Sequence, residues 1–146
     1  MSRRCILQIE DEESDVILLK HAFKKAGIDA PVFVATDGAE AIAYFTGTGQ
    51  FADRREFPLP CLVLLDLKLP DKNGIEILQW IREQVALQTT VVVALTSSDH
   101  DGDIRSAYES GVNSYVVKPS NNQKRIEFAQ NLKGWWLGCN QLCVAS

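Results

Sequence analysis

The sequence predicts a doubly wound α/β domain, in which five helices cover the two faces of a five-stranded parallel sheet. Short apolar runs of strand length alternate with longer segments of helical periodicity, which is the pattern of βαβ units. The apolar runs are nearly continuous, as expected for strands that helices cover on both faces. With 146 residues, the chain is expected to form a single domain over residues 1–146.

The first βαβ unit is expected in the first 35 residues. Strands are predicted at 4–10 and 32–35, and a helix begins near Ser14 between them. The apolar residues of this helix recur at helical spacing, and Gly27 follows as a typical residue past a helix end. The order strand, helix, strand then requires a right-handed crossover.

The second helix is expected to begin after Asp37, whose carboxylate would cap it, with Glu40 as its capping-box partner. The connection 46–60 contains two glycines and two prolines and predicts a polar, mobile loop. The third strand is predicted at 61–65, and Asn73 is the expected cap of the third helix.

The remaining elements complete the alternation. The fourth strand is predicted at 90–95 and the fifth at 114–117. The helix between them runs from near Asp101 and stops before Gly111. The last helix is expected to begin at Asn121 or the asparagine after it.

Polar side chains follow the ends of four predicted strands, and they are the most informative feature of the chain. They are Glu10 and Asp11 after the first strand, Asp66 after the third, Thr96 after the fourth and Lys118 after the fifth. Because ligands bind at the carboxyl ends of the strands in such sheets, we expect these side chains to converge. Clustered carboxylates repel one another unless a cation joins them, and Mg²⁺ prefers such ligands.

The same cluster predicts phosphoryl chemistry. Carboxylates can form acyl-phosphate intermediates, which makes Asp66 the candidate nucleophile. Lys118 would supply a charge to one phosphoryl oxygen and Thr96 a hydrogen bond to another.

Composition excludes several classes of protein. The formal net charge of -4 disfavours nucleic acid as a partner. No segment reaches the roughly 18 apolar residues that span a bilayer, so no membrane contact is expected. The N-terminus lacks the apolar core and cleavage site of a signal peptide, and a cytoplasmic location is predicted.

Over residues 4–132, the chain resembles the receiver domain of two-component response regulators. Four segments carry the resemblance: Ile6–Glu12, Leu64–Gly74, Ala94–Ser98 and Tyr115–Pro119. The resemblance implies a flavodoxin-like fold with strand order 2-1-3-4-5. It also implies a signalling switch rather than an enzyme, with at most self-phosphotransfer and autodephosphorylation.

The resemblance further implies roles for individual residues. Asp66 would accept a phosphoryl group from a sensor histidine kinase, and Lys118 would bind that group. Mg²⁺ would be held directly by Asp11 and Asp66, by the backbone carbonyl of Lys68, and through water by Glu10. Thr96 and Tyr115 would form the switch pair, and the peptide between Lys118 and Pro119 is expected to be cis.

A narrower resemblance is to the single-domain regulators that partner bacterial phytochromes. It rests on the insertion before the third strand, the turn Asp71–Gly74, the segment Thr96–Asp99 and the Trp-rich tail. It implies a phytochrome-type kinase as partner. The expected output is a changed surface on the fourth helix, fifth strand and fifth helix, which alters contacts with other proteins.

The last helix and the tail at about 134–146 are rich in apolar residues. One set at helical spacing is Phe128, Leu132, Trp135, Cys139 and Leu142, and a second is Ile126, Ala129 and Trp136. One set can face the core, and the other then needs a partner. A homodimer is therefore predicted, with Phe128, Leu132, Trp135 and Trp136 as candidate contacts. The alternative is a tail that folds back on its own domain.

Other functions are weighed against the switch. A phosphoryl sink or carrier, and a pseudo-receiver that binds partners without phosphorylation, use the same fold. An aspartyl phosphatase usually needs a second acid two residues after the nucleophile, where this chain has Lys68. A flavodoxin needs a phosphate loop after the first strand, where this chain has acids.

Overall fold

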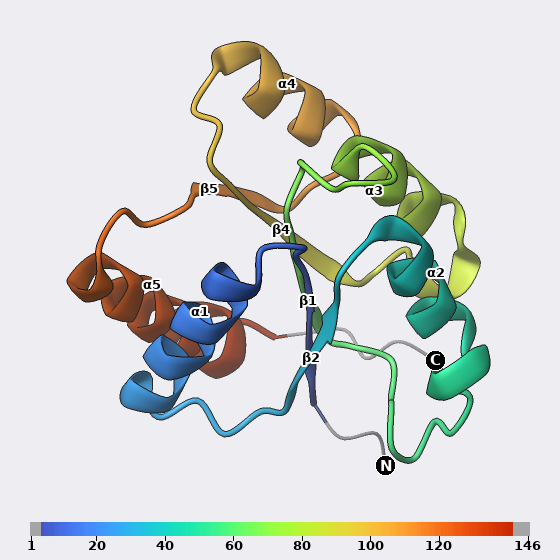
Figure 1. Ribbon diagram of the computed structural model, residues 1–146, viewed down its shortest axis with the longest axis horizontal. Helices are drawn as coiled ribbons and strands as arrows, with labels where there is room; N and C mark the ends of the chain where they lie inside the picture. Colours follow the sequence, from blue (N-terminus) through green and yellow to red (C-terminus); the bar gives the residue numbers. More distant parts are fainter. Residues whose placement is uncertain (1–3, 142–146) are drawn as a thin grey trace.

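The computed structural model describes residues 4–141 and confirms the predicted sheet. Five parallel strands lie in the order β2-β1-β3-β4-β5 (Figure 1). The strands are β1 Ile6–Ile9, β2 Val32–Ala35, β3 Leu62–Leu65, β4 Val91–Thr96 and β5 Ser114–Val117. The chain runs from β1 to β2 at one edge of the sheet and then passes back over β1 to β3. The direction in which strands are added therefore reverses between β1 and β3. Such a switch point is where doubly wound sheets bind ligands.

Five α-helices cover the sheet, two on one face and three on the other (Figure 1). They are α1 Glu13–Ala26, α2 Gly38–Thr46, α3 Gly74–Glu83, α4 Asp101–Glu109 and α5 Asn122–Gly134. Successive strand residues point to opposite faces. Leu7 and Ile9 therefore pack with α2 and α3, whereas Ile6 packs with α1 and α5. Burial on both faces explains why the strands are apolar throughout.

The helix boundaries agree with the predicted caps. Asp37 accepts a hydrogen bond from the backbone N–H of Glu40 at 2.7 Å, and Asn73 caps α3. Asn121 caps α5. Gly27 ends α1 with a φ of 76°, a left-handed conformation that glycine adopts without steric cost.

Part of the connection 46–60 packs into the core, which differs from the polar surface loop that its composition predicts. A short 3₁₀-helix, Gly49–Phe51, places the Phe51 ring in the core against Tyr44, with ring centroids 5.0 Å apart. The guanidinium of Arg54 donates to the carbonyls of Tyr44, Phe45 and Phe57, which satisfies the end of α2. Long-range aromatic packing thus overrides a composition typical of loops.

The chain beyond α5 forms a π-helical turn, Trp135–Cys139. Trp136 packs against the core face of α1 and α5 while Trp135 stays exposed. The predicted contact at Leu142 lies outside the described residues. None of the helices within residues 4–141 has the length and hydropathy to cross a bilayer.

Candidate metal and phosphoryl site

The strand register brings the predicted site residues to one edge of the sheet. Ile9 pairs with Leu65, so the residues that follow them, Glu10 and Asp66, leave the sheet side by side. Thr96 is the last residue of β4, and its carbonyl accepts the N–H of Lys118 at 2.8 Å. Parallel pairing alone therefore gathers side chains from four strands.

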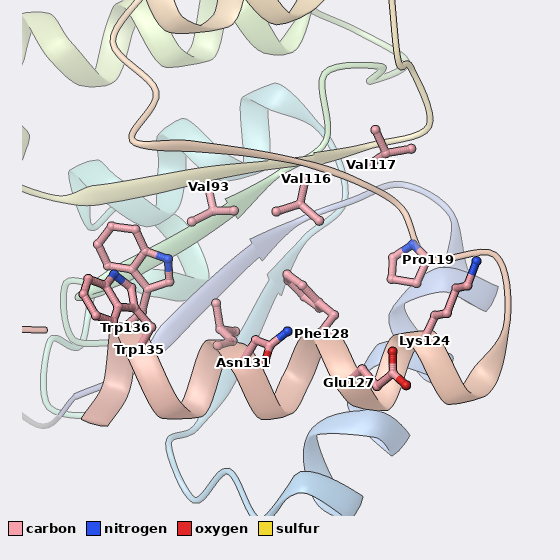
Figure 2. A pocket seen from close by; sticks show the side chains of 11 residues that line it. Val93, Val116, Val117, Pro119, Lys124, Glu127, Phe128, Asn131, Trp135 and Trp136 are labelled. Atoms are coloured by element: carbon pink, nitrogen blue, oxygen red, sulfur yellow. The ribbon is translucent and has the colours of Figure 1, made fainter. Parts of the chain in front are cut away.

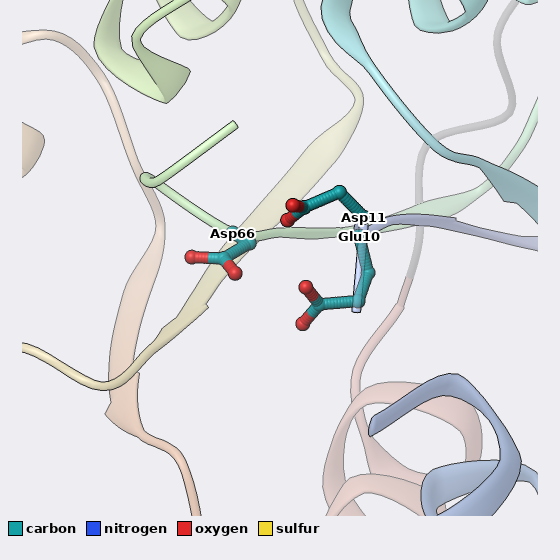
Figure 3. Close-up of side chains that lie close together, drawn as sticks. All are labelled: Glu10, Asp11 and Asp66. Atoms are coloured by element: carbon teal, nitrogen blue, oxygen red, sulfur yellow. The ribbon is translucent and has the colours of Figure 1, made fainter. Parts of the chain in front are cut away.

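Three carboxyl groups converge at this edge. Glu10, Asp11 and Asp66 each offer an oxygen, and these oxygens lie within 4.8 Å of one another. Figure 3 shows the groups of Asp11 and Glu10, from the end of β1, facing that of Asp66. Glu10 and Asp66 are buried, whereas Asp11 is exposed. A small cation with oxygen ligands fits this donor set.

Glu10 shows how unfavourable the cluster is without a cation. The pKa of Glu10 is raised to about 7, mainly by burial; the hydrogen bond to Lys118 opposes this shift, and the nearby carboxylate of Asp66 adds to it. Its second carboxylate oxygen accepts the N–H of Glu12 at 3.2 Å. Desolvation and like charge both penalise the ionised carboxylate, and a divalent ion would relieve both.

Lys118 is held by three carboxylates. Its Nζ lies 2.7 Å from Glu10 Oε1, 2.7 Å from Asp15 Oδ2 and 3.0 Å from Asp66 Oδ2. Burial lowers the pKa of Lys118, but the hydrogen bonds to Asp15, Glu10 and Asp66 together raise it above its ordinary value. The ammonium is therefore charged at neutral pH and sits beside the candidate acceptor.

The loop after β3 fixes the carboxylate of Asp66. Its Oδ1 accepts the N–H of Lys68 at 3.0 Å, and the N–H of Gly74 donates to the Leu67 carbonyl at 2.9 Å. A Cβ at Gly74 would lie 2.5 Å from the Leu67 Cα, so only glycine permits this approach of α3. The backbone of Lys68 is thus beside Asp66, and the metal contact of its carbonyl stays a prediction.

Thr96 and Tyr115 occupy the side of the site next to α4. Thr96 is fully buried, and its hydroxyl is one of two buried side-chain groups without a hydrogen-bond partner within residues 4–141. A cavity of about 220 Å³ lies beside it, lined among others by Lys68 and Ser98. The Tyr115 hydroxyl donates to the Ser98 carbonyl at 2.9 Å. A buried hydroxyl without a hydrogen-bond partner lowers the stability of the protein, so the Thr96 hydroxyl is favoured to donate to an acceptor that enters the site.

Sequence reasoning missed two contributors to this edge, Asp15 and Asp71. Asp15 lies one turn before Leu19, which is buried against the sheet, so the inward-facing stripe of α1 could have revealed it. Asp71 accepts the N–H groups of Gly38 and Ala39 at 2.7 and 3.0 Å, which caps α2 from another loop. No local spacing signals such a contact.

One expectation from the resemblance is wrong. The described backbone contains no cis peptide bond, so the peptide between Lys118 and Pro119 is trans, the form that X–Pro bonds generally favour.

The candidate dimer residues line a groove between the sheet and α5. The groove has a volume of about 500 Å³, and Figure 2 shows Phe128 pointing from α5 towards Val116 of β5. Trp135 and Trp136 lie at its end (Figure 2). Leu132 is buried in the chain's own core and offers little surface to a partner.

Comparison with known proteins agrees with this geometry. Residues 6–130 match the family model described as the response regulator receiver domain. The response regulator Rcp1 of Synechocystis is 34% identical over 134 residues, which cover 92% of this chain and 89% of Rcp1.

Two solved structures show the same fold over nearly the whole chain. The Mn²⁺-bound form of Rcp1 has a TM-score of 0.85 and 33% identity, covering 97% of this chain and 99% of that one. The phosphorylated cyanobacterial phytochrome response regulator RcpA has a TM-score of 0.89 and 31% identity, covering 98% and 100%.

Proposed function

The chain belongs to the response regulator receiver domain family, and we propose that Asp66 is the residue through which it works as a phosphorylation-dependent signalling switch. The carrying observation is the convergence of Glu10, Asp11 and Asp66 within 4.8 Å, with Lys118 Nζ 3.0 Å from Asp66. A nucleophilic carboxylate, a cation site and a fixed ammonium are the parts that phosphoryl transfer needs.

We propose that the resident ion is Mg²⁺. Asp11 and Asp66 would bind it directly, the Lys68 carbonyl would complete the protein ligands, and Glu10 would act through water. The donor set fits, because a divalent ion offsets the repulsion that, after burial, raises the pKa of Glu10. When bound, the ion would neutralise charge on the phosphoryl oxygens. The Mn²⁺-bound form of the similar Rcp1 supports a divalent metal.

The transfer itself follows from the position of Asp66. A carboxylate oxygen of Asp66 attacks phosphorus while the bond from phosphorus to the donor's imidazole nitrogen breaks, and that nitrogen keeps the electron pair. Lys118 donates to a phosphoryl oxygen, and its raised pKa keeps the proton in place. The phosphorylated form of the similar RcpA supports this chemistry.

The readout would begin at Thr96. Its unpaired hydroxyl would donate to a phosphoryl oxygen, which gives a buried polar group its missing partner. The β4–α4 loop would move together with Thr96. This movement would break the hydrogen bond from the Tyr115 hydroxyl to the Ser98 carbonyl, and the Tyr115 ring would turn. The surface of α4, β5 and α5 would then repack and alter protein contacts.

The partner that we propose is a sensor histidine kinase of the phytochrome type, because the similar regulators are named for phytochromes. The proposal places the protein in the cytoplasm with that kinase. The formal net charge of -4 disfavours nucleic acid as a partner, and a protein target is expected instead.

We also propose a homodimer through the groove beside α5. Trp135 is 59% exposed at the end of that groove, and an apolar surface of this kind favours a protein partner. Sedimentation should give a dimer for the wild type and a monomer for Trp135→Lys, while Val85→Lys, at another exposed apolar position, should stay dimeric. A monomeric wild type would defeat this proposal.

The acceptor role is tested by labelling. With Mg²⁺ and radiolabelled acetyl phosphate, the wild type should gain an acid-stable, base-labile label, and Asp66→Asn should gain none. Asp99→Asn, which removes an exposed carboxylate, is the matched control and should label like the wild type. Equal labelling of Asp66→Asn and the wild type would refute the assignment.

A further inference from the structure

Asp15 makes a contact that the proposed phosphoryl transfer does not require. It comes from the first turn of α1, and its Oδ2 lies 2.7 Å from Lys118 Nζ, closer than Asp66 does at 3.0 Å. A lysine ammonium has three protons to donate. Asp15 and Asp66 accept hydrogen bonds from it, and Glu10 forms an ion pair with it at 2.7 Å, so a further anion must compete with these carboxylates for the ammonium.

The three carboxylates differ in what their release from Lys118 would cost. The side chains of Glu10 and Asp66 are 3% and 6% exposed, so water cannot readily replace the ammonium beside them. The side chain of Asp15 is 36% exposed, so water can solvate it after release. Asp15 is therefore the acceptor that Lys118 can leave most cheaply.

Asp15 also acts through its charge. A phosphoryl group on Asp66 adds nearly two negative charges close to Lys118. Asp15 repels that group and competes with it for the same ammonium. Both effects weaken the binding of the phosphoryl group, and both therefore favour the unphosphorylated protein.

We propose that Asp15 is a positioning residue that holds Lys118 towards α1 and thereby weakens the binding of an anionic group at Asp66. The inference rests on the proposed acceptor role of Asp66. Asp15 touches neither the ion nor the phosphoryl group in this scheme, and it acts through its hold on Lys118 and through its negative charge. Its function is to set the balance between the two states of the switch.

The test measures binding of beryllofluoride, a phosphoryl mimic that coordinates to the aspartyl carboxylate. Titration calorimetry at saturating Mg²⁺ should give Asp15→Asn roughly 3- to 10-fold tighter binding than the wild type, the size expected for losing one charge-assisted competitor. Glu13→Gln is the matched control, because it removes the same charge from the same turn, is exposed, and forms no ion pair within residues 4–141. It should change the dissociation constant by less than about twofold.

A conservative variant separates charge from structure. Asp15→Glu keeps the carboxylate within reach of Lys118 and should bind within about twofold of the wild type. Asp15→Asn that binds no tighter than Glu13→Gln, or Asp15→Glu that binds as tightly as Asp15→Asn, would overturn the inference. A wild type that binds no beryllofluoride would instead refute the acceptor role and, with it, the inference.

Discussion

The carboxyl edge of the sheet and the connection 46–60 at its amino end are both built from distant segments, but they are stabilised in opposite ways. At the carboxyl edge, like charges crowd together and the Thr96 hydroxyl has no partner. In the connection, Arg54 satisfies three carbonyls, and the Tyr44 hydroxyl donates to the Pro58 carbonyl at 2.8 Å. Unmet interactions suit a site that changes state, and satisfied ones suit a permanent scaffold.

The comparison predicts that a substitution in the connection 46–60 has the largest effect on the free energy of unfolding. Phe51 lies buried between Tyr44 and Phe57, with ring centroids 5.0 and 5.2 Å away. Phe51→Ala should lower the free energy of unfolding by about 3–4 kcal/mol, because it leaves a cavity. The fraction of folded protein that accepts phosphate should not change. Urea unfolding measures the first quantity, and Val85→Ala, at an exposed apolar position, serves as control.

A loss below about 1 kcal/mol for Phe51→Ala would show that the connection is not an integral part of the core. The comparison between a permanent scaffold and a changeable site would then fail.

A smaller effect is expected from pH at the site. The folded protein holds the pKa of Glu10 near 7, whereas the ordinary value is 4.5, mainly because the group is buried. The folded state therefore binds the proton more tightly than the unfolded state between these values. Without divalent ions, protonated Glu10 contributes its full share to the free energy of unfolding below pH 4.5. This share is lost as the pH rises towards 7, and the loss is on the order of 2 kcal/mol.

Urea unfolding in chelator at about pH 5 and about pH 8 measures this loss, and Glu10→Gln should remove the part that Glu10 causes. Added Mg²⁺ should restore stability at the higher pH, because a cation favours the ionised carboxylate. Identical pH dependence in the wild type and Glu10→Gln would contradict the electrostatic description of the site.

The smallest effect concerns Asp71, which forms a satisfied contact within the carboxyl edge itself. It lies in the loop after β3 and caps α2, and its pKa is lowered chiefly by the hydrogen bond from the Gly38 N–H. Asp71→Ala should cost about 1 kcal/mol in thermal or urea unfolding, the usual value of a helix cap. Asp29→Ala, at an exposed acid, is the control. An equal cost for both variants would show that the cap adds nothing.

The sequence predicted the sheet and the site because their signals are local. Continuous apolar runs located the strands, and the polar residue after each run located Glu10, Asp66, Thr96 and Lys118 at one edge. Parallel pairing then places these residues together, because it brings the carboxyl ends of all strands to the same edge of the sheet.

What the sequence did not predict depends on contacts between distant segments. The burial of Phe51 needs rings from a strand, a helix and the same connection, and no periodicity marks it. The bridge from Asp71 to Gly38 and the pairing of Asp15 with Lys118 join residues 33 and 103 positions apart. Such contacts follow from the assembled fold and not from residue spacing.

The most direct measurement is to locate the modified residue. The protein is incubated with Mg²⁺ and acetyl phosphate and then reduced with borohydride, which converts an aspartyl phosphate to homoserine, and its peptides are analysed by mass spectrometry. The account predicts homoserine at position 66 and at no other acid, and none when a chelator removes the metal. Modification at Glu10, Asp11 or Asp15 instead, or none in the folded protein, would contradict it.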